Sequence, residues 1–318
     1  MAGDIAMLVA GFVLLVKGAD WLVKSASALA RSLGVSDLVV GLTVVAFGTS
    51  APELVVSVLS SIKGSPDLSI GNVVGSNICN ILLILGVSAL IRPLFATRGT
   101  VWKEIPFMLL ATAALIVQAN DAYLDDSAST ISRGDGLLLL LFFAVFLVYI
   151  GQAVGDLRRR PGQERPAFRA KSGLLLGLSL AMLIGGAAWT VNGAKALALG
   201  LGLSESLLGL TVLAVGTSLP ELATSAVAAY RGNNEIAVGN IVGSNIFNVF
   251  FILGVSAVAS PLPCGAFLNG DLAVMAAASL LLFLAMFFGR PKHQVQRYEA
   301  GFFLLLYAGY IAWLAHRG

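Results

Sequence analysis

The chain contains one sequence motif twice, and this duplication limits its fold more than any other feature. Residues 41–94 return as residues 209–262, 168 positions later. The two copies are identical at twelve of their first 21 positions, and 70–94 matches 238–262 at sixteen of 25. Segments so similar fold alike, so the chain has to be built from two copies of one unit.

The composition of these units is that of a membrane protein. The chain has 318 residues, of which 58% are hydrophobic and only 12% are charged, whereas soluble domains carry about 25% charged residues. A helix that crosses the bilayer needs about 20 mostly apolar residues. Ten stretches qualify, namely 5–24, 37–61, 68–91, 104–119, 136–152, 172–197, 204–229, 236–259, 268–289 and 299–315.

Each repeat holds five of these spans, and five is an odd number. The second repeat therefore enters the membrane from the opposite side, which predicts an all-α integral membrane protein of ten transmembrane helices in two inverted-topology repeats. In such folds the substrate site lies near the midplane, where interrupted helices of the two copies meet, here 48–53 and 216–221. The expected domains are residues 1–152, a short basic linker at 153–171, and residues 172–318.

Lysine and arginine residues set the expected orientation. With the N-terminus outside, fifteen of the 20 basic residues fall in cytoplasmic loops and three in outside segments, which agrees with the positive-inside rule. We expect a multi-pass protein of the cell membrane with both termini outside and the 153–171 loop in the cytoplasm. Asp4 precedes the first span, where a signal peptide would carry basic residues, and the span has a counterpart in the second repeat, so we expect it to be retained rather than cleaved. Within it, Lys17 and Asp20 are spaced to pair or to reach the interface.

Two glutamates are the only acidic residues deep in the apolar spans, Glu53 and Glu221. A charge at the bilayer centre costs about 2.5–3.5 kcal/mol on insertion scales, and no lysine or arginine lies at the same depth to neutralise these two. A proline directly precedes each glutamate and a glycine lies five residues before it, which weakens the helix and frees backbone carbonyls. The pattern favours a cation site; the alternative is a pair of protonated or paired glutamates that only packs helices.

Other oxygen atoms accompany the glutamates. Hydroxyl groups at 49–50 and 217–218 adjoin them, and two stripes of side chains spaced four apart lie on the following spans, Asn72 with Ser76 and Asn80, and Asn240 with Ser244 and Asn248. Such hydroxyls can instead bond back to a kinked helix, and amides can join helices; Asn77 and Asn245 are expected to hold the broken helices together. The candidate ligands are Glu53, Glu221, Asn80, Asn248, Thr49, Thr217, Ser50, Ser218, Ser76, Ser244 and the carbonyls of Ala46 and Ala214.

All of these ligands are oxygens, which suits hard cations such as Ca²⁺, Mg²⁺, Mn²⁺ or Na⁺. Two carboxylates with amide, hydroxyl and carbonyl oxygens favour Ca²⁺, which takes six to eight flexible oxygen ligands. The two glutamates carry a charge of −2, which one Ca²⁺ or two Na⁺ would neutralise. Competition of the two ions for one site is the simplest physical basis for exchange.

At these motifs the chain resembles the cation/calcium exchanger superfamily, especially prokaryotic sodium/calcium exchangers. The resemblance rests on GTSAPE with GNVVGSNICN in the first copy and GTSLPE with GNIVGSNIFN in the second. It implies a secondary active antiporter, not an enzyme, that exchanges several Na⁺ for one Ca²⁺ by alternating access, with the first and sixth helices sliding over an eight-helix core. It also implies that Glu53 and Glu221 are the central ligands.

The resemblance implies Ca²⁺ and Na⁺ as substrates. The composition places the chain in the lipid bilayer, the net charge of +3 is too small to suggest nucleic acid, and we expect no cofactor and no protein partner. Some members carry aspartate at the position of Asn248, whereas both repeats here carry asparagine, so this site has one potential charge fewer. A proton/calcium antiporter is the nearest alternative, because buried glutamates can titrate, although the GNAVE-type motif of that branch is absent. A cation channel and an intramembrane enzyme are more distant; the two histidines, His293 and His316, lie at the membrane margins.

Overall fold

The computed structural model describes residues 2–121, 128–158, 170–200, 214–265, 268–289 and 291–317. These residues are almost entirely helical, with only four two-residue strands. Eight of the helices are long and apolar enough to cross a membrane, and a bent pair, Asp37–Thr49 with Ala51–Ile62, makes nine when counted as one span. The expected seventh span, 204–229, lies partly on 201–213, outside the described residues. The chain is therefore an all-helical, multi-pass membrane protein.

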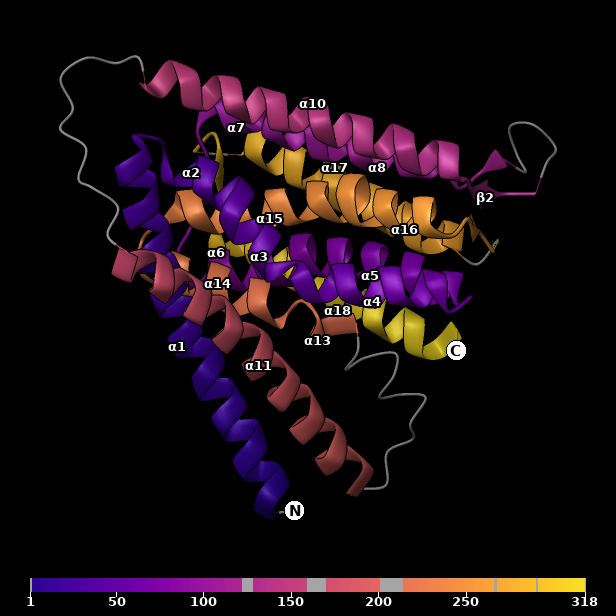
Figure 1. Cartoon of the computed structure of the whole chain (residues 1–318), viewed down its shortest axis with the longest axis horizontal. Coiled ribbons are helices and arrows are strands. Elements are labelled where there is room, and N and C mark those ends of the chain that lie inside the picture. The colour runs from indigo at the N-terminus through magenta and orange to yellow at the C-terminus, as the bar shows by residue number, and fades with distance from the viewer. Residues whose placement is uncertain are drawn as a thin grey trace.

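The described elements lie along the chain in the following order (Figure 1). Before residue 160 they are α1 (Ala2–Leu33), α2 (Asp37–Val40), η1 (Gly41–Val45), α3 (Ala46–Thr49), α4 (Ala51–Ile62), α5 (Pro66–Ile78), η2 (Cys79–Ile84), α6 (Leu85–Ile91), β1 (Leu94–Phe95), α7 (Arg98–Trp102), α8 (Glu104–Gln118), β2 (Thr130–Ile131) and α10 (Arg133–Arg158). After it they are α11 (Ala170–Gly200), α13 (Ala214–Gly216), α14 (Leu219–Tyr230), α15 (Asn234–Ile246), η4 (Phe247–Leu253), α16 (Gly254–Ala259), β3 (Leu262–Pro263), α17 (Leu268–Phe288), β4 (Gln294–Val295) and α18 (Arg297–Arg317).

The helices α1 and α11 lie side by side and cross the rest of the molecule obliquely (Figure 1). Glycines let their backbones approach closely, because a Cβ on Gly11 would come within 2.8 Å of the Gly186 carbonyl and a Cβ on Gly193 within 2.8 Å of the Leu8 nitrogen. Small residues play this role at helix interfaces in membranes, where apolar burial from water does not drive association. These contacts also show that α1 and α11 run antiparallel.

The core of the bundle consists of two long helical rods, α5–η2–α6 and α15–η4–α16. Of the most apolar window in each, 72% and 83% of the residues are buried inside the protein, against 17–44% for the other six spanning helices. Each rod contains a π-helical segment, and a third such segment, η1, precedes the bend in the second span. These π-helical segments were not predicted from the sequence. π-Helical turns often mark functional sites, and here η2 and η4 contain Asn80 and Asn248.

Two short antiparallel strand pairs connect distant loops. Leu94 and Phe95 of β1 pair with Val295 and Gln294 of β4, and Thr130 and Ile131 of β2 pair with Pro263 and Leu262 of β3. Each pair joins a loop of the first repeat to a loop of the second. The pairs therefore tie the ends of the two repeats together.

Candidate functional site: two buried glutamates between the repeats

The second span is broken directly before Glu53, as the sequence predicts. Its two halves, which end at Thr49 and begin at Ala51, are bent by 48°, and Ser50 between them has φ −81° and ψ 8°. Ser218 has nearly the same backbone angles, φ −87° and ψ 5°, at the matching position between α13 and α14. A proline in the first turn suits the start of each new helix, because the N–H groups of a first turn have no partner within the helix.

The break does not release the carbonyl of Ala46, contrary to our expectation. The Ser50 N–H donates to it over 3.0 Å. Pro52 lacks the N–H that would donate to the carbonyl four residues before it, which is that of Gly48, two residues after Ala46. Ala214, the corresponding residue, begins α13 at the edge of the described chain.

Each glutamate accepts a hydrogen bond from the serine of the other copy. The Ser218 hydroxyl donates to Glu53 Oε1 over 3.1 Å, and the Ser50 hydroxyl donates to Glu221 Oε1 over 2.8 Å. The stripe serine of the same copy adds a longer contact to each, Ser76 to Glu53 at 3.4 Å and Ser244 to Glu221 at 3.5 Å. The two breaks therefore interlock, and the site belongs to both repeats at once.

Both glutamates are completely enclosed by protein. Glu53 is 0% exposed and Glu221 is 1% exposed, and within the described residues neither forms an ion pair. Their second carboxylate oxygens, Oε2 in both, are buried with no hydrogen-bond partner. Buried polar atoms almost always have a partner, so these two oxygens lack one that a cation would supply.

The asparagine stripes hold the broken helices and also link the two copies. Asn72 Nδ2 donates to the Glu53 carbonyl over 3.3 Å and to the Ser57 hydroxyl over 2.9 Å. Asn240 makes the same two contacts in the second copy, with the Glu221 carbonyl at 3.4 Å and Ser225 at 2.9 Å. Their Oδ1 atoms accept from the threonine of the opposite break, Thr217 to Asn72 at 3.3 Å and Thr49 to Asn240 at 3.0 Å.

The other four asparagines join the two central rods. Asn248 Nδ2 donates to Asn77 Oδ1 over 2.9 Å, and Asn80 Nδ2 donates to Asn245 Oδ1 over 3.2 Å. Asn77 and Asn245 thus join one rod to the other. We expected them to hold the broken helices, but Asn72 and Asn240 do so instead. The Oδ1 atoms of Asn80 and Asn248 are buried without a partner.

A cavity of about 210 Å³ reaches the site from one side. It lies between α11 and the two breaks, with Pro52, Gly216 and Thr217 on the site side and residues 184–192 of α11 opposite. Thr217 is 9% exposed, whereas Thr49, its counterpart, is fully buried. Access to the site therefore differs between the two copies.

Comparison with known proteins identifies the family. The sodium/calcium exchanger protein family matches residues 4–152 and 171–315 of the chain.

This chain belongs to the sodium/calcium exchanger family.

Several relatives match over almost their whole length. The chain is 38% identical over 321 residues to the inner membrane protein YrbG of Escherichia coli, covering 98% of this chain and 95% of that protein. It is 35% identical over 340 residues to the sodium/calcium exchanger MaX1 of Methanosarcina acetivorans, covering 96% of each. A crystal structure of the sodium-calcium exchanger NCX_Mj soaked with Na⁺ and Sr²⁺ superposes with a TM-score of 0.82 at 36% identity, covering 97% of this chain and 98% of that one.

In this family member, no three or more His, Cys, Asp or Glu side chains among the described residues lie close enough together to hold a metal ion. A cation at the glutamates has to complete its coordination with hydroxyl, amide or carbonyl oxygens, as the sequence predicts. Ser57 and Ser225, which accept hydrogen bonds from Asn72 and Asn240, were not among the predicted site residues. Their only signal is that both occupy the same position, four residues after a glutamate.

Proposed function

We propose that this protein is a secondary active antiporter that exchanges Na⁺ for Ca²⁺ across the membrane at a site centred on Glu53 and Glu221. The observation that carries the proposal is the pair of carboxylates, both enclosed, with no basic partner among the described residues and each with one buried oxygen lacking a hydrogen bond. Two such carboxylates in a membrane favour a bound cation, because a buried charge needs a partner.

The proposed ligands are those that the sequence predicts. Carboxylate oxygens of the two glutamates supply a charge of −2, which either one Ca²⁺ or two Na⁺ would balance. Hydroxyl oxygens at 49–50 and 217–218, Ser76 and Ser244, and the carbonyls of Ala46 and Ala214 complete the set. A hydroxyl that donates to a carboxylate keeps its lone pairs for an ion, and a carbonyl that accepts one hydrogen bond keeps one of its two lone pairs. Asn80 and Asn248 add neutral oxygens, so the site holds two charges rather than three.

We further propose ten spans in two inverted repeats, with residues 1–152 and 172–318 as the repeats, the 153–171 linker in the cytoplasm and both termini outside. Two observations support this topology. The first helices of the two repeats, α1 and α11, run antiparallel, and each strand pair joins two loops that the topology puts on one side, β1 with β4 in the cytoplasm and β2 with β3 outside.

The function is tested by ⁴⁵Ca²⁺ uptake into proteoliposomes loaded with Na⁺ and diluted into Na⁺-free buffer. Matched vesicles contain K⁺, or carry only a proton gradient. We expect uptake with internal Na⁺ alone, its loss in Glu53→Gln, and its retention in Glu299→Gln, a glutamate that accepts from the Gln296 N–H at the start of α18. Uptake driven by a proton gradient alone contradicts Na⁺ coupling and identifies a proton/calcium antiporter. Uptake in K⁺ vesicles without a counter-ion identifies a channel.

A further inference from the structure

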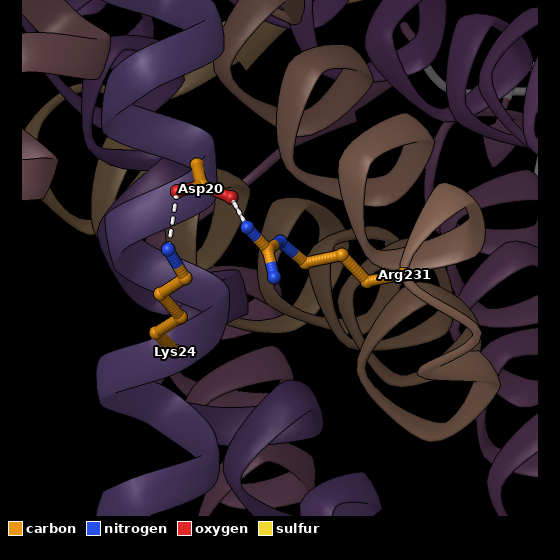
Figure 2. Close-up of polar contacts among 3 residues, drawn as sticks. All are labelled: Asp20, Lys24 and Arg231. Carbon is orange, nitrogen blue, oxygen red and sulfur yellow. Dashed lines mark hydrogen bonds and ion pairs between the residues drawn. The ribbon is translucent and has the colours of Figure 1, made fainter.

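The second half of α1 forms ion pairs that have no counterpart on α11. Asp20 accepts from Lys24 on the same helix, at 2.8 Å, and from Arg231 directly after α14 (Figure 2). This arrangement replaces the pairing of Lys17 with Asp20 that the sequence left open. Arg231 ends the seventh span, so the pair ties the first helix of one repeat to the broken helix of the other.

The matching positions of the other copy cannot form this pair. The offset of 168 residues places Ala188 where α1 has Asp20, and Lys63 where α14 is followed by Arg231. The helix α11 contains no acidic residue from Ala170 to Gly200. Ala188 instead lines the cavity beside the site. The same symmetry operation that gives matching ligands thus gives an ion pair on one side and an opening on the other.

The packing of the two helices follows this difference. In the described residues α1 packs along α14, whereas α11 makes no comparable contact with α4, the counterpart of α14. Beyond Asp20, α1 buries three residues, namely Leu22, Val23 and Ala26. Their counterparts on α11, 168 positions later, are only half-buried, namely Thr190, Val191 and Ala194. The charged end of α1 is therefore docked on the core where α11 is not.

A second group of contacts secures the same end of α1. The Ser27 hydroxyl donates to Asp37 over 2.8 Å, and Asn233, two residues beyond Arg231, donates to both Ser27 and Asp37. At the position of Ser27, α11 carries Lys195. Arg92 also lies here, its guanidinium against Gly232, a glycine with φ +76° that leaves room for it. In the proposed topology this end faces the cytoplasm, and the cavity along α11 lies in the outer half of the membrane.

We propose that the Asp20–Arg231 pair is a latch that holds the inner half of α1 on α14 and so keeps the ion site closed toward the cytoplasm. This inference rests on the proposed function, because closing one side matters only to a protein that opens on each side in turn. Both residues are positioning residues, since neither touches the glutamates. The latch must break each time the site opens inward, so it biases the equilibrium toward the outward-open state.

The test measures which side of the site is open. A single cysteine replaces either Ala19 on α1 or its counterpart Ala187 on α11, in a protein with Cys79→Ala and Cys264→Ala that still binds its ion. Membrane-impermeant maleimide is applied from one side of oriented vesicles, and the labelling rate is followed with and without the latch. Asp20→Asn and Arg231→Gln each break it. Lys24→Gln is the control, because Lys24 contacts Asp20 from within α1 and does not bridge to α14.

We expect each latch variant to raise cytoplasmic labelling of Ala19→Cys and to lower outside labelling of Ala187→Cys. A partly exposed ion pair shifts an equilibrium by roughly two- to fivefold. Arg231→Lys keeps the pair and should keep the original rates, and the charge swap Asp20→Arg with Arg231→Asp should restore them. Unchanged rates, or rates that rise on both sides together, contradict the latch, as does a folded charge swap that behaves like the single variants.

The labelling does not depend on which ions cross the membrane. If the protein carries no Na⁺ or Ca²⁺ but the rates shift in opposite directions, the proposed function fails and the latch stands. If exchange is confirmed and the rates do not respond, the latch alone is wrong. A thermal melt of each detergent-solubilised variant identifies those that do not fold, and for these the conservative Arg231→Lys and the charge swap carry the test.

Discussion

The two breaks surround their glutamates in the same way, whereas the two long helices beside them, α1 and α11, pack differently. Glu53 contacts Ser218 and Ser76. Glu221 makes the equivalent contacts with Ser50 and Ser244. In contrast, α1 is tied to α14 by an ion pair, and α11 leaves a cavity. An antiporter has to bind each of its ions from either side of the membrane, so its ligands can be symmetric. Only one side of the site is open at a time, so the helices that cover it cannot be arranged symmetrically.

The largest expected effect concerns the glutamates. Glu53→Gln and Glu221→Gln should each weaken Ca²⁺ exchange by at least about 100-fold, because each removes half of the charge that balances the ion, and ligand charge sets Ca²⁺ affinity over several orders of magnitude. Initial rates of ⁴⁵Ca²⁺ uptake at several Ca²⁺ concentrations measure this. The symmetric site requires losses of similar size, so a variant that keeps near-normal uptake breaks the comparison.

A smaller effect is expected for the crossed serines. Ser50 donates one hydrogen bond to Glu221, whereas Ser218 contacts both Glu53 and Ser76, each at 3.1 Å. Hydrogen bonds to charged groups contribute about 1.5–3 kcal/mol, so either alanine variant should raise the half-saturating Ca²⁺ concentration by roughly tenfold, Ser218→Ala more than Ser50→Ala. Ser60→Ala serves as the control, because Ser60 is a buried serine of α4 that lies about two and a half turns beyond the break. Equal effects would show that the Ser218–Ser76 contact is unimportant.

The smallest effect concerns the glycines under α11. A Cβ at Gly216 would lie 2.7 Å from Val191 Cγ2, and one at Gly48 would lie 2.6 Å from Leu180 Cδ2. Valine has few rotamers, whereas the end of a leucine side chain can turn aside. Overpacking costs about 1–3 kcal/mol, so Gly216→Ala should lower the melting temperature by a few degrees and Gly48→Ala by less. Gly71→Ala, with open space around its Cβ position, should leave it unchanged. The reverse order would show that α11 is held more tightly at Gly48.

Much of the site could be predicted because it depends on local sequence. A carboxylate in an apolar span, a proline beside it and a hydroxyl pair before it are visible without a fold, and the stripe spacing follows from 3.6 residues per turn. The break at Ser50 and the enclosed glutamates confirm those predictions. The prediction that proline frees the Ala46 carbonyl was wrong, because that carbonyl accepts from the Ser50 N–H. The N–H that Pro52 lacks would have bonded to Gly48, two residues after Ala46. Asn77 was expected to hold the broken helix, but Asn72 does so and Asn77 contacts Asn245, because the partners of both residues lie on other helices.

That this chain is a duplicated membrane protein with two glutamates in broken helices follows from its residues alone, because repetition, hydropathy and charge depend only on the order of residues. The hydrogen bonds from Ser50 to Glu221 and from Ser218 to Glu53, partners 171 and 165 residues apart, exist only once the helices pack together. The same packing pairs Asp20 with Arg231 rather than with Lys17. Such contacts depend on how helices from different repeats cross, and periodicity along one helix contains no information about the residue that faces it from another.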